Sequence, residues 1–155
     1  AAAAGATVTH VDASKGMVTW AKENAVSSGL KDAPIRWLVD DCVKFVEREI
    51  RRGNTYDAII MDPPSYGRGP KGEIWKIEDM IHPLIRLCAK ILSEDALFFL
   101  VNSYTTGLAP AVLTYMISTE LKSWNGHVDS QEIGLPVTNS GLVLPCGASG
   151  RWESR

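Results

Sequence analysis

Residues 56–67 read Tyr-Asp-Ala-Ile-Ile-Met-Asp-Pro-Pro-Ser-Tyr-Gly, and this segment is the clearest indication of the fold class. Its apolar run, Ala58 to Met61, is typical of a strand buried on both faces of a parallel sheet. Asp62-Pro63-Pro64 ends the run, because proline has no N–H to donate to a β-ladder. The strand therefore delivers an acid, two rigid prolines and an aromatic side chain, Tyr66, to its carboxyl end. Open α/β sheets bind their ligands at that edge.

The segment from Asp62 to Tyr66 favours a pocket for a planar, polar group. Proline restricts its own backbone and that of the residue before it, so the carbonyls of this segment point in set directions. The Asp62 carboxylate and these carbonyls accept hydrogen bonds from amino or ring N–H groups, and Tyr66 is suited to stack on a base. The alternative is a proline-rich turn that only ends the strand, with Asp62 bonded to nearby amides.

The rest of the chain alternates strands with amphipathic helices and ends in a hairpin. This order predicts a doubly wound α/β fold, a parallel sheet with helices on both faces and a carboxyl-terminal antiparallel hairpin. Pro83 fits its helix only if it falls in the first turn. We expect strands at 7–11, 35–39, 58–61, 96–101, 128–135 and 142–146, helices at 14–29, 42–52, 79–92 and 109–121, and a loop at 67–76.

Length and composition fit one globular domain, residues 1–155, because 45% of the residues are hydrophobic. The net charge of −2 gives no global signature of nucleic-acid binding, so any such contact must be local. Three cysteines without metal-like spacing favour a reducing compartment and no metal site. No apolar run approaches the ~20 residues that span a bilayer, and no signal peptide is evident, so we expect a cytoplasmic protein without a membrane partner.

Acids end three successive predicted strands: Asp12, Asp41 (or its neighbour Asp40) and Asp62. The carboxyl ends of parallel strands share one edge, so these acids are expected to line one crevice. A carboxylate in the place of Asp12 suits the hydroxyls of a ribose, and Asp41 suits an adenine amino group. The alternative for each is capping of the following helix. Asp12 alone does not separate a nicotinamide cofactor from S-adenosylmethionine, but Asp-Pro-Pro favours the latter because hydride transfer needs no such motif.

These motifs resemble those of class I S-adenosylmethionine-dependent methyltransferases, and most closely the bacterial 23S rRNA large-subunit methyltransferases of the cytosine carbon-5 type. The resemblance implies a Rossmann-like methyltransferase fold and an RNA substrate, with rRNA the expected one. It also implies that Asp12 and Ser14 lie at the ribose, that Asp41 and Cys42 lie at the adenine, and that Asp62, Pro63, Pro64 and Tyr66 face the methyl group and the target base. The residues that carry it are Val11-Asp12-Ala13-Ser14, Asp40-Asp41 with Lys44-Phe45, and Met61-Asp62-Pro63-Pro64-Ser65-Tyr66.

The family's first strand and glycine-rich loop have no counterpart in the sequence. Ala1 to Gly5 resembles the tail of the helix that follows this loop, so we expect an amino-terminally truncated chain whose S-adenosylmethionine affinity is weaker than that of an extended one. By the resemblance, the absent strand belongs between 7–11 and 58–61. The two bare edges would then recruit another chain, so we expect the gap to be filled by self-association or by another peptide in preference to direct closure of the two strands.

The family's cysteine after the later apolar strand is also missing, because that place reads Asn102-Ser103-Tyr104. Cys42, Cys88 and Cys146 are interpreted as small buried hydrophobic residues, and Cys146 is expected at the opposite edge of the sheet. A carbon nucleophile needs the thiolate, whereas an amino nitrogen or a hydroxyl does not. The sequence therefore favours N- or O-methylation over methylation of cytosine carbon 5.

Cationic and aromatic residues follow Tyr66 closely: Arg68, Lys71, Trp75 and Lys76. They suit contacts with phosphates and a base. A solvated loop, in which Glu73 and Glu78 offset the charges, explains them equally well.

Two other functions remain open. The chain fits a non-catalytic nucleotide-binding or scaffold module of the same fold, since the glycine loop is absent. A nicotinamide oxidoreductase would need a Gly-x-Gly-x-x-Gly turn upstream, and it leaves Asp-Pro-Pro unexplained.

Overall fold

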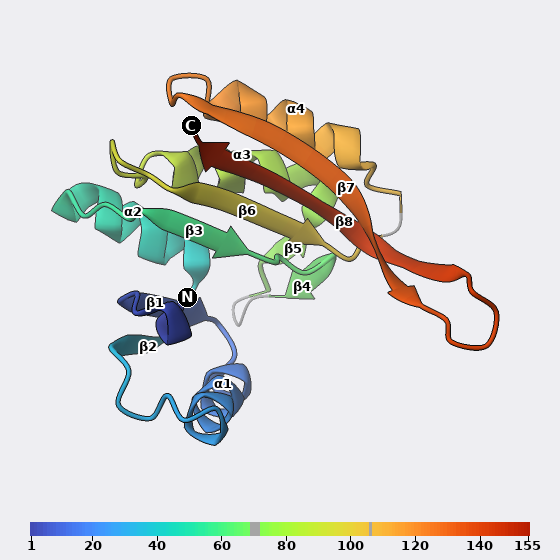
Figure 1. Ribbon diagram of the computed structural model, residues 1–155. Helices are drawn as coiled ribbons and strands as arrows, with labels where there is room; N and C mark the ends of the chain where they lie inside the picture. The colour runs from blue at the N-terminus through green and yellow to red at the C-terminus, as the bar shows by residue number, and fades with distance from the viewer. Residues whose placement is uncertain (69–71, 106) are drawn as a thin grey trace. The chain divides into compact units, whose positions relative to one another are not determined.

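The computed structural model describes residues 1–68, 72–105 and 107–155, and the chain forms two compact units (Figure 1). Unit 1 is Ala1–Arg52 and unit 2 is Gly53–Arg155. No helix in the described ranges is long and apolar enough to cross a bilayer.

Unit 1 holds two parallel strands, β1 (Val8–Asp12) and β2 (Ile35–Val39), paired in register from Val8 with Ile35 to Asp12 with Val39. The 3-10 turn η1 (Ala2–Ala4) ends at Gly5, whose φ of 90° is left-handed, as is usual for a glycine that ends a helical turn. The remaining elements are the helices α1 (Lys15–Ser27) and α2 (Cys42–Arg52). The predicted bounds of β2 and α2 are confirmed.

Unit 2 contains a four-stranded mixed sheet in the order β3-β6-β8-β7. The strands β3 (Ala58–Met61) and β6 (Phe98–Ser103) are parallel. The hairpin of β7 (Gly126–Pro136) and β8 (Val143–Ser154) joins this pair by antiparallel pairing of β8 with β6. The predicted combination of parallel strands with a reversed carboxyl-terminal strand is thus confirmed.

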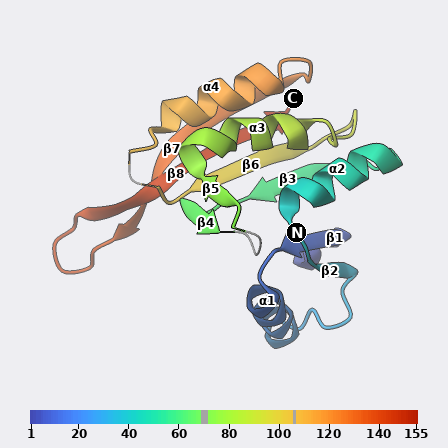
Figure 2. The same ribbon diagram turned by 180° about the vertical axis from the view of Figure 1, so that it is seen from behind.

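The helices α3 (Ile77–Ala89) and α4 (Pro110–Glu120) cover the same face of this sheet, as the two opposite views show (Figures 1 and 2). Strand β6 alternates half-buried with fully buried residues, as expected for a strand with one face on the core. Side chains from β6, α3 and α4 form this core, and their exposed fractions are at most 1%: Phe99, Val101, Ile81, Ile85, Leu113 and Ile117.

The predicted loop at 67–76 is wrong. Two short antiparallel strands occupy it, β4 (Tyr66–Arg68) and β5 (Ile74–Lys76); residues 69–71, among them Lys71, lie outside the described residues. Helix α3 also begins two residues earlier than expected, because the N–H of Ile77 donates to the carbonyl of Ser65 at 3.1 Å. Pro83 therefore lies in the second turn and not in the first, which corrects the expectation for its position.

Strand β8 is longer than predicted and continues to Ser154. The small residues of its second half do not form a hydrophobic pattern that predicts a strand. Packing requires them, because a Cβ on Gly150 would lie 2.8 Å from the Cβ of Leu113 in α4. Ala148 pairs with Ser103 at the carboxyl end of β6. Cys146 therefore lies toward the carboxyl edge of the parallel pair, so its expected place at the opposite edge is wrong.

The two strands that were expected to flank the absent strand, β1 and β3, each have one unpaired edge in the described sheets. In unit 1, β1 pairs with β2 on one side, and in unit 2, β3 pairs with β6 on one side. Such edges are templates for pairing with another chain. The expectation that they recruit a partner strand stays a prediction.

Replacing Gly147 by alanine should destabilise unit 2, because a Cβ there would overlap the carbonyl oxygen of Ser103. We expect a loss of about 3 kcal/mol in the free energy of unfolding, measured by urea denaturation. Gly67→Ala is the matched control, since its Cβ would meet that of Trp75 at an ordinary 3.6 Å, and we expect a change within about 0.5 kcal/mol. Equal stability of the two variants would contradict the close approach of β8 to Ser103.

Candidate functional site

In unit 1 the carboxyl ends of β1 and β2 bring four of the predicted cofactor residues together. The N–H of Asp40 donates to the backbone carbonyl of Asp12 at 3.0 Å, which joins the two strand ends. The thiol of Cys42 lies 3.7 Å from the carbonyl oxygen of Val11 and donates to it. Cys42 is exposed, so its interpretation as a small buried hydrophobic residue is wrong. The start of α2 is therefore fixed next to the end of β1.

Asp12 and Ser14 form the turn that leads into α1. Oδ1 of Asp12 accepts from the N–H of Ser14 at 2.6 Å, and Oγ of Ser14 accepts from the N–H of Met17 at 3.3 Å. Ser14 is thus the N-cap of α1. Oδ2 of Asp12 makes no hydrogen bond within the described part of unit 1, so half of this carboxylate is available to a ribose hydroxyl.

Asp41 caps α2, which is the alternative that the sequence left open for it. Its Oδ1 accepts from the N–H of Lys44 at 2.9 Å, while its side chain stays exposed. Asp40 has different partners: Oδ1 accepts from the N–H of Asp41 and Oδ2 forms an ion pair with Arg48. Of the two acids, Asp41 is the more accessible to a ligand.

In unit 2, Asp62 follows β3 directly and its side chain is exposed. Among the described residues of this unit, the Asp62 carboxylate has no hydrogen-bond partner. The alternative in which Asp62 bonds the amides of its own turn therefore receives no support from the geometry, and both oxygens can accept from a ligand.

The two residues after Pro63 are held from several sides. The carbonyl of Pro64 accepts from the indole N–H of Trp75 at 2.6 Å, and Oγ of Ser65 lies 2.6 Å from Oγ1 of Thr105. The carbonyl of Ser65 caps the start of α3 through Ile77. The segment after β3 is therefore tied to the hairpin β4–β5, to the residues after β6 and to α3.

Tyr66 presents its ring and not a free hydroxyl. Its side chain is 51% exposed, and its hydroxyl oxygen accepts from Nε of Arg68 at 3.0 Å. Arg68 thus orients the ring and places a positive charge beside it. Lys76 is exposed as well, whereas Trp75 is half-buried and donates to Pro64, so its expected contact with a base is replaced by a supporting role.

The end of β6 lies close to this segment. Ser103 is fully buried and its hydroxyl accepts from the N–H of Thr105 at 3.2 Å, which shapes the turn that reaches Ser65. The first residues of β8 approach the same place, since Gly147 packs against Ser103 and Tyr104. The thiol of Cys146 donates to the carbonyl of Ile133 at 3.4 Å within the hairpin.

Three residues of this region were missed or misassigned from the sequence. Trp75 carried a signal, because Gly72 ahead of Ile74-Trp75 suggests a turn followed by a strand. Thr105 and Gly147 carried none, since their contacts join segments about 40 residues apart.

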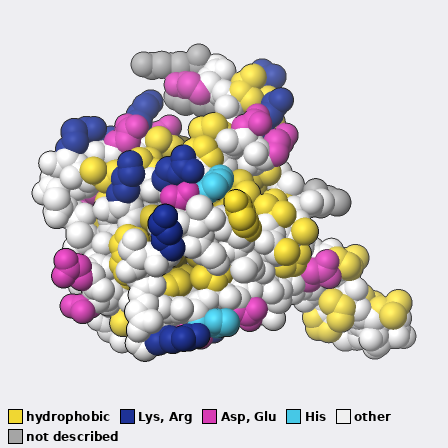
Figure 3. All heavy atoms as spheres, turned by 90° about the horizontal axis from the view of Figure 1, so that it is seen from above, with side chains coloured by type: hydrophobic (Ala, Val, Ile, Leu, Met, Phe, Trp, Pro, Cys, Tyr) yellow, Lys and Arg dark blue, Asp and Glu magenta, His cyan; other side chains and the backbone are white. Residues whose placement is uncertain are grey.

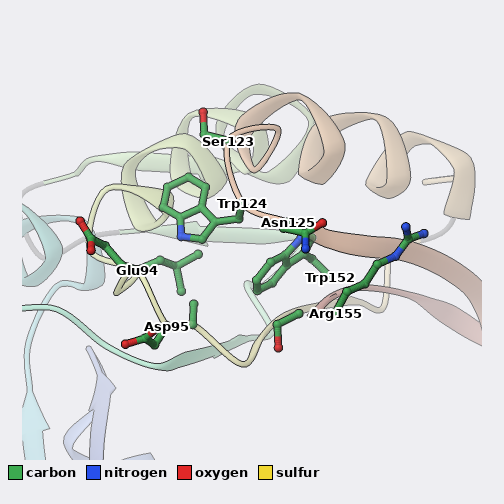
Figure 4. Close-up of a pocket in the computed structure, with 10 residues that line it drawn as sticks. Glu94, Asp95, Ser123, Trp124, Asn125, Trp152 and Arg155 are labelled. Atoms are coloured by element: carbon green, nitrogen blue, oxygen red, sulfur yellow. The ribbon is translucent and has the colours of Figure 1, made fainter.

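The pocket in Figure 4 lies elsewhere in unit 2 and contains none of the predicted site residues. Its volume is about 580 Å³, and it lies at the amino end of β6, where Trp124 and Trp152 form its apolar walls and Glu94 and Asp95 its acidic rim. The predicted site residues therefore lie outside this pocket, and those of unit 2 lie at the carboxyl ends of the parallel strands. Within the described residues, no group of three or more His, Cys, Asp or Glu side chains is placed to hold a metal ion.

Comparison with curated proteins finds rRNA methyltransferases. The ribosomal RNA large subunit methyltransferase K/L of Pseudoalteromonas atlantica is 36% identical over 86 residues, which is 55% of this chain and 12% of that protein. The enzyme of the same name from Legionella pneumophila is 30% identical over 112 residues, 71% of this chain and 15% of that protein. The chain thus spans a small part of the relatives that it matches. No family model matches it.

Comparison with solved structures finds the expected fold. A SAM-dependent methyltransferase from Agrobacterium tumefaciens is 41% identical with a TM-score of 0.92, over 99% of this chain and 51% of that one. A candidate methyltransferase crystallised with S-adenosylhomocysteine is 22% identical with a TM-score of 0.71, over 93% of this chain and 38% of that one. The Rossmann-like methyltransferase fold that the resemblance implied is confirmed.

Trp75→Phe should lower the free energy of unfolding, because it keeps the ring and removes the N–H that the Pro64 carbonyl accepts. We expect a loss of about 1 kcal/mol, measured by urea denaturation. Trp20→Phe is the control, since Trp20 is 57% exposed on α1, and it should change stability by less than about 0.5 kcal/mol. A Trp75→Phe protein as stable as the parent would show that this hydrogen bond does not hold the segment.

Proposed function

We propose that this protein is an S-adenosylmethionine-dependent methyltransferase that acts on a base of ribosomal RNA in the cytoplasm. One observation carries the proposal: the exposed carboxylate of Asp62, which has no hydrogen-bond partner among the described residues, stands at the carboxyl end of β3. The residues that follow the first proline, Pro64 and Ser65, are held in place by Trp75 and Thr105. The likeness to the large-subunit methyltransferases over 86 residues, and to the Agrobacterium structure over nearly the whole chain, supports it.

Unit 1 supplies the contacts to the nucleoside part of the cofactor in this proposal. The available oxygen of Asp12 accepts from the ribose, beside the turn of Ser14, and the exposed Asp41 accepts from the adenine amino group next to Cys42. The residues present fit these roles, because each carboxylate keeps an oxygen that the helix caps do not use. When bound, S-adenosylmethionine supplies an electrophilic methyl group on a sulfonium.

Unit 2 supplies the binding of the methyl acceptor. Asp62 accepts a hydrogen bond from the amino or hydroxyl group of the target and orients its lone pair, and Tyr66 stacks on the base with its ring. Pro63 and Pro64 keep this geometry without rearrangement, so the contribution of the protein is positioning. The Pro64 carbonyl is already bonded to Trp75, which leaves Asp62 as the main acceptor for the incoming group. We propose that the two units together serve as one catalytic domain.

The atom that receives the methyl group is proposed to be nitrogen or oxygen. Methylation at carbon 5 of cytosine requires a thiolate to add to carbon 6 of the ring first, which makes carbon 5 nucleophilic. The end of β6 and the residue after it read Asn102, Ser103 and Tyr104, and none of them is a cysteine. Cys146 lies at the same edge, but its thiol is only half-exposed and donates to a backbone carbonyl of the hairpin.

Asp12→Ala should weaken S-adenosylmethionine binding at least about tenfold, because a hydrogen bond from a ribose hydroxyl to a charged carboxylate contributes on the order of 1.5–3 kcal/mol. Isothermal titration calorimetry on the protein expressed from its whole gene measures this. Asp32→Ala is the control, an exposed acid of unit 1 before the amino end of β2, and should leave the affinity unchanged. Equal affinities for both variants would refute the ribose role, and no binding by any form would favour a non-catalytic module.

Asp62→Ala should reduce methyl transfer to rRNA at least about a hundredfold, because it removes the group that positions the acceptor, while cofactor affinity stays within a few-fold. Transfer is measured by mass spectrometry of nucleosides from treated rRNA, in which we expect no 5-methylcytidine. Asp57→Ala is the matched control, because Asp57 lies before the amino end of β3 and bonds Ser93. Wild-type turnover by Asp62→Ala would be incompatible with the proposed acceptor site.

A further inference from the structure

Asn102 in β6 lies next to Asp62 on the sheet of unit 2. The last residues that β3 and β6 pair in parallel register are Met61 and Val101, so the next residue on each strand is Asp62 and Asn102. Pro63 disfavours the helical region for the residue before it, so Asp62 stays extended and continues the direction of β3. Neighbouring strands lie about 4.8 Å apart, and the two side chains therefore start side by side.

Both side chains project from the face of the sheet that α3 and α4 do not cover. Val101 faces the helices, because it is fully buried and its partner in β8, Gly150, lies against α4. Alternation along β6 then places Asn102 on the opposite face. On β3 that face is marked by Ile60, which is 58% exposed, and Asp62 shares it because it follows two residues later.

A row of polar residues crosses the sheet at this level. Asn102 pairs with Ser149 in β8, and Ser149 pairs with Gln131 in β7, so the polar row consists of Asp62, Asn102, Ser149 and Gln131. The hairpin β7–β8 continues past the ends of β3 and β6 and projects from the sheet (Figures 1 and 3). Asp62 and Asn102 therefore lie at the carboxyl edge of the parallel pair, where the proposed acceptor site is.

The amide group of Asn102 is available to a ligand. The residue is half-buried, and its side chain makes no hydrogen bond to another described residue. Its polar atoms are not sealed from solvent, because in the described ranges the one side-chain N or O atom that is buried without a partner is Nε2 of His10 in unit 1. A half-buried amide that the protein leaves unbonded is suited to bond a ligand at this edge.

Together the two side chains are complementary to an exocyclic amino group. The Asp62 carboxylate only accepts hydrogen bonds, whereas the Asn102 amide offers one acceptor oxygen and an NH₂ donor. An amino group has two N–H bonds and can serve two neighbouring acceptors, but a hydroxyl or a ring N–H can serve only one. The NH₂ of Asn102 then donates to the ring nitrogen beside the amino group, as asparagine does when it binds adenine with two hydrogen bonds.

We propose that Asn102 binds the target base together with Asp62, and that the methyl acceptor is an exocyclic amino nitrogen of adenine, cytosine or guanine. Uracil is excluded because it has no amino group and would turn a carbonyl oxygen toward the Asp62 carboxylate. The inference rests on the proposed function, which it narrows from nitrogen or oxygen to this class of nitrogen.

The amino nitrogen forms the new N–C bond with its lone pair. The S–C bond of the sulfonium breaks at the same time, and its electron pair stays on sulfur as S-adenosylhomocysteine leaves. One of the two amino protons passes to the Asp62 carboxylate and from there to water, so the charge is balanced. Asn102 holds the base in place during this step and exchanges no proton.

The first test is the identity of the product that the protein expressed from its whole gene makes. Mass spectrometry of nucleosides from treated rRNA should find the methyl group on an exocyclic amino nitrogen, as N6-methyladenosine, N4-methylcytidine or N2-methylguanosine. A methyl group on a ring nitrogen, on a base oxygen or on uracil would overturn the inference. If Asp62→Ala abolished that transfer, the proposed function would still stand.

The second test is the variant Asn102→Ala. It should lower kcat/KM for rRNA at least about tenfold, because it removes the hydrogen bonds to the base. Affinity for S-adenosylmethionine, measured by calorimetry, should stay within a few-fold, and circular dichroism verifies the fold. Gln131→Ala is the matched control, since this exposed amide belongs to the same polar row but lies two strands, or about 10 Å, from Asn102, and it should leave kcat/KM unchanged.

The outcomes separate this inference from the proposed function. An Asn102→Ala protein with the kcat/KM of the parent would overturn the inference alone, as would equal losses in Asn102→Ala and Gln131→Ala. No methyl transfer to rRNA by the parent would overturn the proposed function, and this inference with it.

Discussion

The absence of an N–H on Pro63 and Pro64 is the constraint on which the arrangement of unit 2 depends. It ends the β-ladder after Met61 and turns the chain away from the sheet. The carbonyls that follow are then taken by groups from other segments, the Pro64 carbonyl by Trp75 and the Ser65 carbonyl by the start of α3. Asp62 is left exposed between β3 and a rigid turn. The expected burial of β3 on both faces is wrong, because none of its four residues is fully buried and Ile60 is 58% exposed.

Rigidity at this edge comes from contacts that are distant in sequence. The hydroxyl pair of Ser65 and Thr105 connects the ends of the two parallel strands, and the turn after β6 is shaped by the buried hydroxyl of Ser103. The start of β8 packs on that turn because Gly147 has no side chain. The base of the hairpin β7–β8 therefore supports the candidate site.

The sequence was sufficient for elements with a strong period or a strong end signal. Strand β3 has its predicted bounds because an apolar run followed by Asp-Pro-Pro marks both ends of a strand. Helix α2 has its predicted bounds because its amphipathic pattern ends at two arginines. It was insufficient where tertiary contacts determine where an element begins or ends. Pro83 was misplaced because Ser65 starts α3 early, and β8 was cut short because its glycines serve packing against α4. Cys146 was consequently assigned to the wrong edge.

The most direct test of the central claim is a crystal structure of the protein with S-adenosylhomocysteine and an RNA fragment that contains its target nucleotide. The account predicts the acceptor nitrogen or oxygen within about 2.6–3.2 Å of the Asp62 carboxylate, with the base on the ring of Tyr66. A target base bound away from Asp62, for example between Trp124 and Trp152 at the amino edge of the sheet, would contradict it.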